Sequence, residues 1–323
     1  MKKIKAVCQD GFKKVYSLLA KTPLRKVPGM WDISDIIIRN IWGKTNTIEI
    51  EGSKMYINLR DPSPSMRKTF QAYVLRQIHE ETTTALFKKM VKPQDTVLDL
   101  GANIGYFTLL AARLVGKSGK VFSFEPEPTN FNYLKKNIEI NGYGNVTAEN
   151  KAVSNTNGKT KLFICSYDSG HHTINQYDGI EAYSRGKPSE KNFIEIDTVI
   201  LDEFLKDKTE KVNIVKIDIE GAETLAISGM RSILKNNAKI KVFLEFFPIL
   251  IEKMGHSSAK LIESLLEDFK FNIYVIGHDY SMQGYDMEFL KIQSYDQLLG
   301  LLKDKYDHVN LYLTRETLSN SRS

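Results

Sequence analysis

One stretch decides the fold: Thr96-Val97-Leu98-Asp99-Leu100-Gly101-Ala102-Asn103-Ile104-Gly105. Its first half, Thr96–Leu100, is an apolar run of the kind found in strands that are buried on both faces. The run stops at Gly101, and Gly105 precedes the helical pattern of Tyr106–Arg113. Glycine has no Cβ, and the start of a helix offers unpaired N–H donors, so a ligand can approach the backbone here. The stretch therefore predicts a ligand-binding turn between a strand and a helix.

The alternation of strand and helix continues along the chain. Strands are predicted at Thr96–Leu100, Lys120–Phe124, Val146–Ala152, Val212–Ile217, Lys239–Phe246, Asn272–Ile276 and Val309–Leu313. Helices are predicted at Tyr106–Leu114, Asn130–Asn141, Glu223–Leu234, Ser258–Phe269 and Ser294–Lys303. Such alternation is typical of a mostly parallel sheet that is covered by helices on both faces. We therefore expect an α/β protein with a mostly parallel sheet of seven strands.

Shorter elements are predicted around this core. The elements before it are a helix at Asp35–Trp42, a β-hairpin over Thr47–Leu59, and helices at Phe70–Arg76 and Glu80–Met90. Leu162–Cys165 and Phe193–Asp197 are predicted to add edge strands to the sheet. Between them, residues 166–192 are polar, and a long polar excursion from a compact sheet is more often functional or mobile than structural.

Charge is distributed unevenly along the chain. The 323 residues suit one large α/β domain with additions, or two small domains, and carry a formal charge of +6. Residues 1–26 hold eight Lys and Arg against one Asp, a charge of +7, so the remainder is nearly neutral. We therefore expect no nucleic-acid partner. The basic arm is either a solvated helix face, which we favour, or a peripheral contact with a membrane surface.

The cysteines and the apolar runs indicate the cellular compartment of the protein. Cys8 and Cys165 lie far apart and provide neither a disulfide framework nor a CxxC metal clip. No apolar run is long enough to span a bilayer, and the basic start Met1–Lys5 is not followed by the apolar core of a signal peptide. We therefore expect a protein of the reducing cytoplasm.

The glycine spacing narrows the choice of cofactor. A dinucleotide fold favours G-x-G-x-x-G, whereas Gly101 and Gly105 form G-x-x-x-G, so NAD(P) and FAD are disfavoured. The strand Lys120–Phe124 ends in Glu125-Pro126, where the proline biases Glu125 toward an extended backbone. A carboxylate at this edge can accept two hydrogen bonds from ribose hydroxyls. We favour this role over that of a solvated charge at the end of a strand.

Another strand brings more carboxylates to the same edge. The buried run Ile214–Ile217 leads into Asp218-Ile219-Glu220-Gly221-Ala222-Glu223. Ligands of open α/β sheets bind where the strands have their carboxyl ends. Glu223 also suits the start of a helix, because an acid complements the helix dipole. Asp218 and Glu220 are the better site candidates, since a carboxylate on a buried strand needs a partner.

These motifs together resemble the FkbM family of S-adenosylmethionine (SAM)-dependent methyltransferases. The segments that carry the resemblance are Val97–Phe107, Phe124–Pro126, the T-x-x-L-D-x-F pattern of Thr198–Phe204, Lys216–Glu223 and Phe243–Glu245. They cover roughly residues 80 to 250. The resemblance implies a class I methyltransferase domain with a Rossmann-like fold over residues 80–315. The residues outside it are predicted to form a basic helical arm and hairpin over residues 1–79 and a tail over residues 316–323.

The resemblance also implies a set of cofactor-binding residues for SAM. They are Asp99, Gly101, Ala102, Asn103, Gly105, Tyr106, Phe107, Glu125, Pro126, Asn150, Lys151, Ala152 and Asp218. Within this set, Gly101, Asn103 and Gly105 would line the methionine end, and Glu125 would bind the ribose. Asp218 would face the methyl group, and Asn150–Ala152 would lie near the adenine.

The implied reaction is methylation of an oxygen, often a sugar or polyketide hydroxyl. Transfer from a sulfonium is an in-line displacement, and an alcohol acceptor benefits from a base. The candidate catalytic residues are Asp218, Glu220, Glu245, His171 and His172. Crowding of the first two carboxylates would raise the pKa of one of them. The histidines either reach over the site or lie in a solvent-exposed loop.

Two questions stay open at the level of sequence. Asp218, Glu220 and Glu245 have the chemistry of Mg²⁺ ligands, but contacts to cofactor and acceptor explain them better, so we expect no metal. The expected acceptor is a sugar, a glycan or a similar small molecule. Rival readings are an N-methyltransferase acting on a peptide or small amine, and a non-catalytic binding protein with the same fold.

Overall fold

The computed structural model describes residues 11–12, 30–43, 46–165, 169–174, 193–209, 211–277, 289–302, 308–318 and 321–322. Most of the basic arm of residues 1–26 and most of the polar excursion of residues 166–192 therefore lie outside the described residues. None of the helices formed by the described residues has the length and apolarity needed to cross a membrane.

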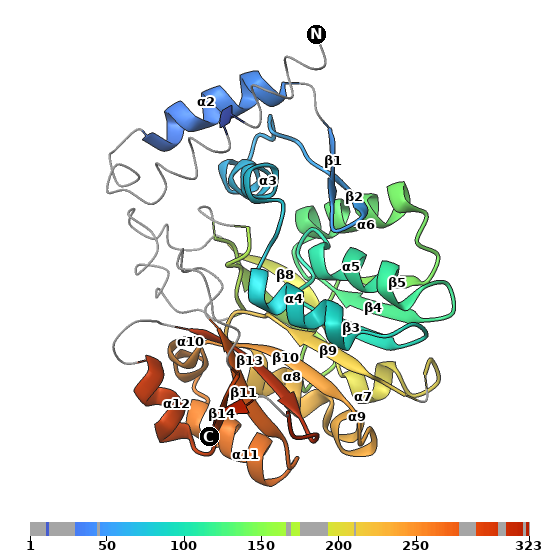
Figure 1. Cartoon of the computed structure of the whole chain (residues 1–323), viewed down its shortest axis with the longest axis vertical. Helices are drawn as coiled ribbons and strands as arrows, with labels where there is room; N and C mark the ends of the chain where they lie inside the picture. Colours follow the sequence, from blue (N-terminus) through green and yellow to red (C-terminus); the bar gives the residue numbers. More distant parts are fainter. Residues whose placement is uncertain are drawn as a thin grey trace.

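A nine-stranded sheet forms the centre of the molecule (Figure 1), in the order β14-β12-β11-β13-β10-β9-β3-β4-β5. The strand bounds are β3 Thr96–Leu100, β4 Lys120–Phe124, β5 Val146–Glu149, β9 Ile214–Ile217, β10 Lys241–Phe246, β11 Asn272–Gly277, β12 Phe289–Ile292, β13 Val309–Thr314 and β14 Ser321–Arg322. Strands β5, β4, β3, β9 and β10 are parallel, and β13 runs antiparallel between β10 and β11. All seven predicted strands contribute to this sheet, and β12 and β14 extend it beyond β11.

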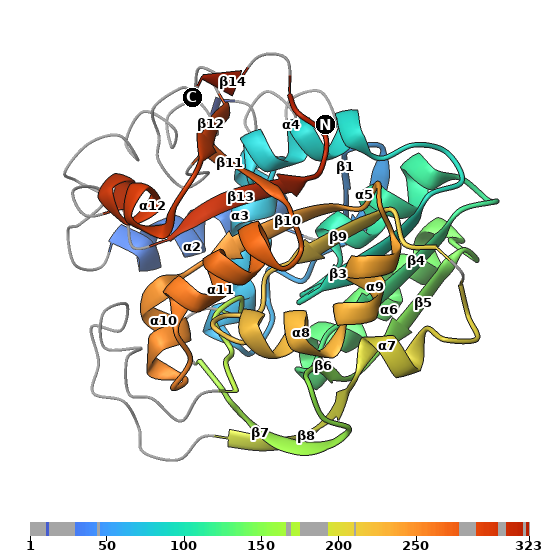
Figure 2. The same ribbon diagram turned by 90° about the horizontal axis from the view of Figure 1, so that it is seen from below.

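Helices cover both faces of the sheet (Figures 1 and 2). On one face lie α4 Glu81–Met90, α5 Tyr106–Val115 and α6 Pro128–Asn141. On the other lie α7 Leu201–Phe204, α8 Glu223–Gly229, α9 Arg231–Asn236, α11 Ser258–Glu267 and α12 Tyr295–Leu302, and α10 Pro248–Lys253 follows β10. Successive strand residues alternate between the two cores, as Val97 and Leu98 do. The predicted Rossmann-like class is confirmed.

The N-terminal part packs onto the same core. It contains α2 Met30–Trp42, the predicted hairpin of β1 Thr47–Ile50 and β2 Ser53–Tyr56, and α3 Pro64–Arg76. The start of α3 lies at Pro64, earlier than predicted, because the Ser63 hydroxyl caps the helix by accepting from the Met66 N–H. Ile38 and Phe70 are fully buried in the core that also holds Val97.

Two predictions about strands were wrong in detail. The predicted strand Val146–Ala152 divides into β5 and a separate β6 Ala152–Val153, because the Asn150 side-chain amide donates to the carbonyls of Glu125 and Pro126 and turns the chain. The predicted edge strands correspond to β7 Gly158–Phe163 and β8 Phe193–Val199. They form a three-stranded sheet in the order β6-β8-β7, apart from the central sheet.

One predicted helix is broken. The segment Glu223–Leu234 forms α8 and α9, separated at Met230, whose φ of −131° is not helical. Just before the break, Gly229 lies so close to the chain after β6 that a Cβ on it would be 2.1 Å from the Ser154 carbonyl oxygen. The end of α8 is therefore set by contact with another element, which periodicity in the sequence does not report.

Gly101 holds the ligand edge of the sheet together. Its φ is +82°, and a Cβ on it would lie 1.7 Å from the carbonyl oxygen of Asp218 at the end of β9. Its N–H donates to the carbonyl of Phe124 at the end of β4, 2.9 Å away. Only glycine allows the ends of these strands to approach so closely.

We expect Gly101→Ala to lower the free energy of unfolding by more than about 3 kcal/mol, because the added Cβ must displace β9 as well as strain the backbone. Gly142 has a similar φ of +64° but open space around it, so Gly142→Ala should cost about 1 kcal/mol. Urea denaturation of both variants measures the difference. An equal loss in the two variants would contradict this account of Gly101.

Candidate active site

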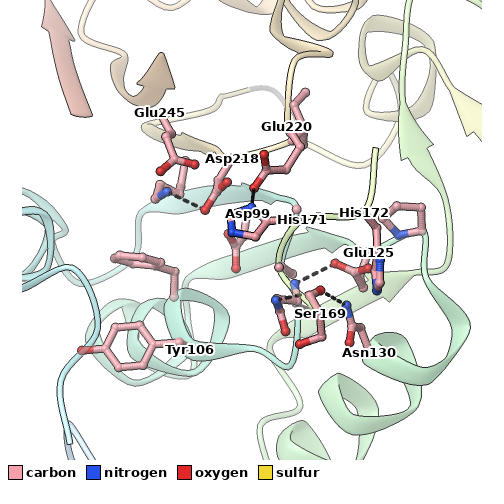
Figure 3. A pocket seen from close by; sticks show the side chains of 18 of the residues that line it. Asp99, Tyr106, Glu125, Asn130, Ser169, His171, His172, Asp218, Glu220 and Glu245 are labelled. Carbon is pink, nitrogen blue, oxygen red and sulfur yellow. Dashed lines mark hydrogen bonds and ion pairs between the residues drawn. The ribbon is translucent and has the colours of Figure 1, made fainter. Parts of the chain in front are cut away.

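A cavity of about 560 Å³ opens at the carboxyl edge of the sheet, where β3, β4, β9 and β10 end (Figure 3). Every residue predicted for the site lines this cavity, except Gly105 and Asn150. Gly105 begins α5, and a Cβ on it would lie 2.8 Å from the Leu134 side chain. The side-chain amide of Asn150 donates a hydrogen bond to the backbone carbonyl of Glu125. Both residues therefore shape the cavity without forming its wall.

Glu125 lies in the cavity wall at the end of β4, and it is only 5% exposed. Its two carboxylate oxygens accept hydrogen bonds from the backbone N–H groups of Asn103, at 2.7 Å, and Glu127, at 2.9 Å. Burial raises the pKa of Glu125 to about 8, and these backbone donors oppose the shift. Each oxygen keeps a further lone pair or carries the proton, so the fixed carboxyl group can form hydrogen bonds with two hydroxyl groups.

Asp218 and Glu245 form a carboxyl pair away from Glu125 (Figure 3). A hydrogen bond links their side chains. Burial and the neighbouring Asp218 raise the pKa of Glu245 well above its usual range. Burial would also raise the pKa of Asp218, but the ammonium of Lys216 lowers it. A proton shared by this pair is therefore held on Glu245 in preference to Asp218.

The ammonium of Lys216 lies between two carboxylates. Its Nζ is 3.4 Å from Asp218 Oδ2 and 3.5 Å from Glu80 Oε2, and the lysine side chain is 1% exposed. Burial alone would lower the pKa of Lys216, yet the charges of Asp218 and Glu80 raise it above its usual range. Glu80 has a left-handed backbone with φ of +44° at the start of α4, and the Asn310 amide donates to it.

Neither Lys216 nor Glu80 was predicted to belong to the site. The signal for Lys216 was present, because residues two apart on a strand point to the same face and Asp218 follows it at that spacing. Glu80 has no comparable local signal. Its partner lies far along the chain, and only the packing of α4 against the sheet brings the two together.

Residues 169–174 form a short segment along the cavity. The Ser169 carbonyl accepts from the side-chain amides of Asn130, at 2.9 Å, and Asn103, at 3.4 Å. The Ser169 hydroxyl is 2.7 Å from the Thr69 hydroxyl of α3. The segment is therefore tied both to the glycine turn and to the N-terminal part of the chain.

His171 and His172 both line the cavity. His171 Nδ1 lies 2.7 Å from Glu220 Oε1, and the Thr173 hydroxyl donates to the Glu220 carbonyl. His172 Nδ1 accepts from the Cys165 N–H at 3.0 Å. His171 is thus placed for proton exchange with a carboxylate, whereas His172 has one ring nitrogen engaged with the backbone.

Aromatic rings form the wall on the side of the N-terminal part. The rings of Tyr73 and Tyr106 are stacked with centroids 5.8 Å apart, and His79 packs edge-on against Tyr106. The Lys216 ammonium lies over the ring of Phe107, with Nζ 5.0 Å from the ring centroid. Tyr73 and His79 precede the central sheet in sequence, so α3 and the residues that follow it supply part of the cavity.

The remaining acids have different environments. Oxygens of Asp218, Glu220 and Glu245 lie within 4.8 Å of one another, a spacing at which carboxylates can share one cation. The ammonium of Lys216 lies beside Asp218 in this cluster.

Asp99 is buried and accepts a hydrogen bond from the Thr108 hydroxyl of α5. Burial raises the pKa of Asp99 to about 6. Its hydrogen bond indicates that Asp99 joins β3 to α5.

Glu223 does not line the cavity. It is 1% exposed, and its Oε1 accepts from the Gly221 N–H at the start of α8. Burial raises the pKa of Glu223 to about 8, although the backbone donors oppose this. Of the three acids in the Asp218–Glu223 run, two therefore reach the cavity and the third stabilises the turn beneath it.

Residues 99–273 match the family model of the methyltransferase FkbM domain. The match covers more than half of the chain and contains Glu125, Asp218 and Glu245. The chain belongs to the FkbM methyltransferase family.

Several relatives match part of the chain. Methyltransferase 1 of Beauveria bassiana is 27% identical over 149 residues, which are 43% of this chain and 59% of that protein. The chain thus spans less than two thirds of the length of this fungal relative. Hexuronic acid methyltransferase AglP of Haloferax volcanii is 25% identical over 201 residues, 61% of this chain and 76% of the relative. The crystal structure of an FkbM methyltransferase from Methylobacillus flagellatus has a TM-score of 0.40 and 14% identity, covering 77% of this chain and 53% of that one.

We expect Glu223→Gln to change how stability depends on pH. In the folded protein the pKa is about 8, above the ordinary 4.5, so the native state retains a proton that the unfolded chain releases between these values. The native protein therefore loses stability as pH rises from about 5 to 8, by up to roughly 1.4 kcal/mol per pH unit. The glutamine variant should lose less stability over this range, and Glu125, whose pKa is also about 8, contributes to the remaining loss in both proteins.

Denaturation of Glu223→Gln and the native protein at several pH values measures this effect. The cost of burying an amide is independent of pH, so only the slope is diagnostic. Glu267→Gln, on the exposed surface of α11, is the matched control and should follow the native curve. Parallel curves for Glu223→Gln and the native protein would show that Glu223 is ionised when buried.

Proposed function

We propose that the protein is a SAM-dependent O-methyltransferase that acts on a hydroxyl of a sugar, a glycan or a similar small acceptor. The observation that carries this proposal is one cavity with a fixed carboxylate, Glu125, in one part of its wall and the Asp218–Glu245 pair in another. Both lie at the edge where open α/β sheets bind ligands. The first has the chemistry to hold a ribose, and the second has the chemistry to accept a proton.

The residues of the cavity fit SAM. Glu125 is fixed by two backbone donors and keeps lone pairs for the two ribose hydroxyls. Lys151 and Ala152 line the cavity after β5, where we place the adenine. The glycine turn, with Asn103 in a left-handed conformation, would hold the methionine end. A volume of about 560 Å³ falls in the range of sites for molecules of this size.

When bound, SAM would supply an electrophilic methyl group on a positively charged sulfur, with S-adenosylhomocysteine as the leaving group. Asp218 is ionised and accepts a hydrogen bond from the acceptor hydroxyl, which it thereby orients. Because the pKa of Asp218 is low, the hydroxyl proton moves to it only as the new C–O bond forms. Glu245 donates to Asp218, and Lys216 holds the carboxylate in place.

The acceptor side of the proposal rests on the aromatic wall and on one relative. The rings of Tyr73 and Tyr106 offer an apolar surface on which the C–H face of a sugar ring can pack. AglP, whose name describes methylation of a hexuronic acid, aligns with 61% of the chain. We infer a sugar as the acceptor from these two observations.

We expect Asp218→Asn to affect turnover and Glu125→Gln to affect cofactor binding. Asp218→Asn should lower kcat at least about 100-fold and retain binding of S-adenosylhomocysteine, because it removes the proton acceptor. Glu125→Gln should weaken that binding about tenfold, because the amide nitrogen that replaces one carboxyl oxygen can no longer accept hydrogen bonds from the backbone N–H and the ribose. Calorimetry with S-adenosylhomocysteine and transfer of labelled methyl from SAM to a panel of oligosaccharides, uronic acids included, measure the two effects.

The rival functions give different results in the same assays. S-adenosylhomocysteine binding without turnover on any acceptor would favour a binding protein, and a product methylated on nitrogen would favour an N-methyltransferase. Binding of NAD(H) in place of S-adenosylhomocysteine would contradict the proposal. Normal turnover of Asp218→Asn, Glu220→Gln and His171→Ala/His172→Ala would exclude all of these residues as the base.

A further inference from the structure

Helix α2 carries apolar side chains on its outer face. Ile33, Ile36 and Ile37 are 55%, 52% and 37% exposed, and their spacing places them on one side of the helix. The opposite side is buried, since Ile38 and Trp42 are 0% and 4% exposed. Figure 1 shows α2 at the outer limit of the fold, with α3 between it and the sheet. A row of exposed isoleucines on an ordered helix is unusual for a surface that faces only water.

A second cavity adjoins these isoleucines. Its volume is about 510 Å³, and it is lined by Ile36, Arg39, Asn40, Arg60, Asp61, Pro62 and Arg67. Three arginines therefore line a cavity beside an exposed apolar face. Guanidinium groups are well suited to bind phosphate, because they present several donors in one plane.

The acids near this cavity are already engaged. Asp35 pairs with Arg39, at 2.9 Å, and with Arg67, at 3.7 Å, which joins α2 to α3. The Asp61 carboxylate accepts from the Tyr133 hydroxyl and from the Ser63 N–H. Arg60 is exposed and forms no ion pair with any of the described residues. Its positive charge is available to an anion from outside the protein.

The sequence adds positive charge to the same end of the chain. Residues 1–26, which precede α2, have a formal charge of +7, whereas the rest of the chain is nearly neutral. Stable attachment to a bilayer surface without a spanning helix usually needs two signals, an apolar one and a basic one. The isoleucines supply the first, and the arginines and the basic segment supply the second.

We propose that this α2 surface, formed by Ile33, Ile36, Ile37, Arg39, Arg60 and Arg67, docks on an anionic lipid bilayer. The isoleucines enter the boundary between head groups and acyl chains, and the arginine cavity receives a lipid phosphate. This inference is independent of the proposed reaction. Charge complementarity favours a bilayer over a second copy of the chain, because two such basic surfaces would repel each other.

Co-sedimentation of the full-length protein with phosphatidylcholine vesicles, with and without phosphatidylglycerol, tests the proposal. We expect binding to the anionic vesicles to be at least about tenfold tighter, and to weaken as added salt screens the charges. The variant Ile33→Ser/Ile36→Ser/Ile37→Ser should lose about tenfold or more in binding. Arg60→Glu should lose about tenfold, because it reverses a charge at the surface.

Matched controls distinguish this surface from general effects. Ile249→Ser/Leu301→Ser removes apolar side chains that are 49% and 40% exposed on α10 and α12, and it should bind like the native protein. Lys117→Glu changes the net charge as much as Arg60→Glu does, from an exposed position after α5, and should have little effect. Arg39 and Arg67 are left intact because their pairs with Asp35 hold the fold together. All of the variants alter exposed positions, so their unfolding midpoints should match that of the native protein.

Several outcomes would overturn the proposal. These are no association of the native protein with vesicles, equal binding to neutral and anionic vesicles, and full binding by the triple isoleucine variant. The last result would assign membrane contact to residues 1–26 alone. Light scattering that shows a native dimer and a monomeric triple variant would assign the surface to a second copy, and tighter binding to RNA than to vesicles would assign it to nucleic acid.

Discussion

The site depends on one buried positive charge, the ammonium of Lys216. Removing an ammonium from water is costly, and the protein compensates with the carboxylates of Glu80 and Asp218 on either side of it. The charge of Lys216 also affects the protonation of Glu245 at the same edge of the sheet. Because Lys216 keeps Asp218 ionised, the neighbouring Glu245 holds the proton that the two carboxyls share. The charge state of the cavity is therefore set by a residue that is itself almost inaccessible to solvent.

The partners of this charge come from distant parts of the chain. Lys216 and Asp218 lie within the FkbM segment, but Glu80 precedes it and Asn310, which donates to Glu80, follows it. His308 also lies beyond the segment, 3.6 Å from Glu245. The backbone groups that bind Glu125, those of Asn103 and Glu127, lie within the family segment. The structure thus combines a shared central part with a pair of flanking segments that complete the cavity beside Asp218.

Helix α3 connects this cavity with the outer surface. Thr69 and Tyr73 of α3 line the cavity, and Thr69 also contacts Ser169 of the segment along it. Arg67 of the same helix reaches the other way, to Asp35 of α2. Because a helix is a rigid element with residues facing several directions, one short stretch of sequence fixes the distance and orientation between the proposed site and the α2 surface.

The sequence by itself determined what depends on local pattern. The apolar run of Thr96–Leu100 and its glycine turn fixed β3 and the start of α5, and the strand ends placed Glu125 and Asp218 at one edge, because parallel strands share a direction. Only the tertiary structure decided the break at Met230, the separate sheet that contains β8, and the pairing of Glu80 with Lys216. Hydrophobic periodicity reports which face of an element is buried, but it does not report which other element covers that face. Contacts between residues far apart in the chain arise only when the elements pack together.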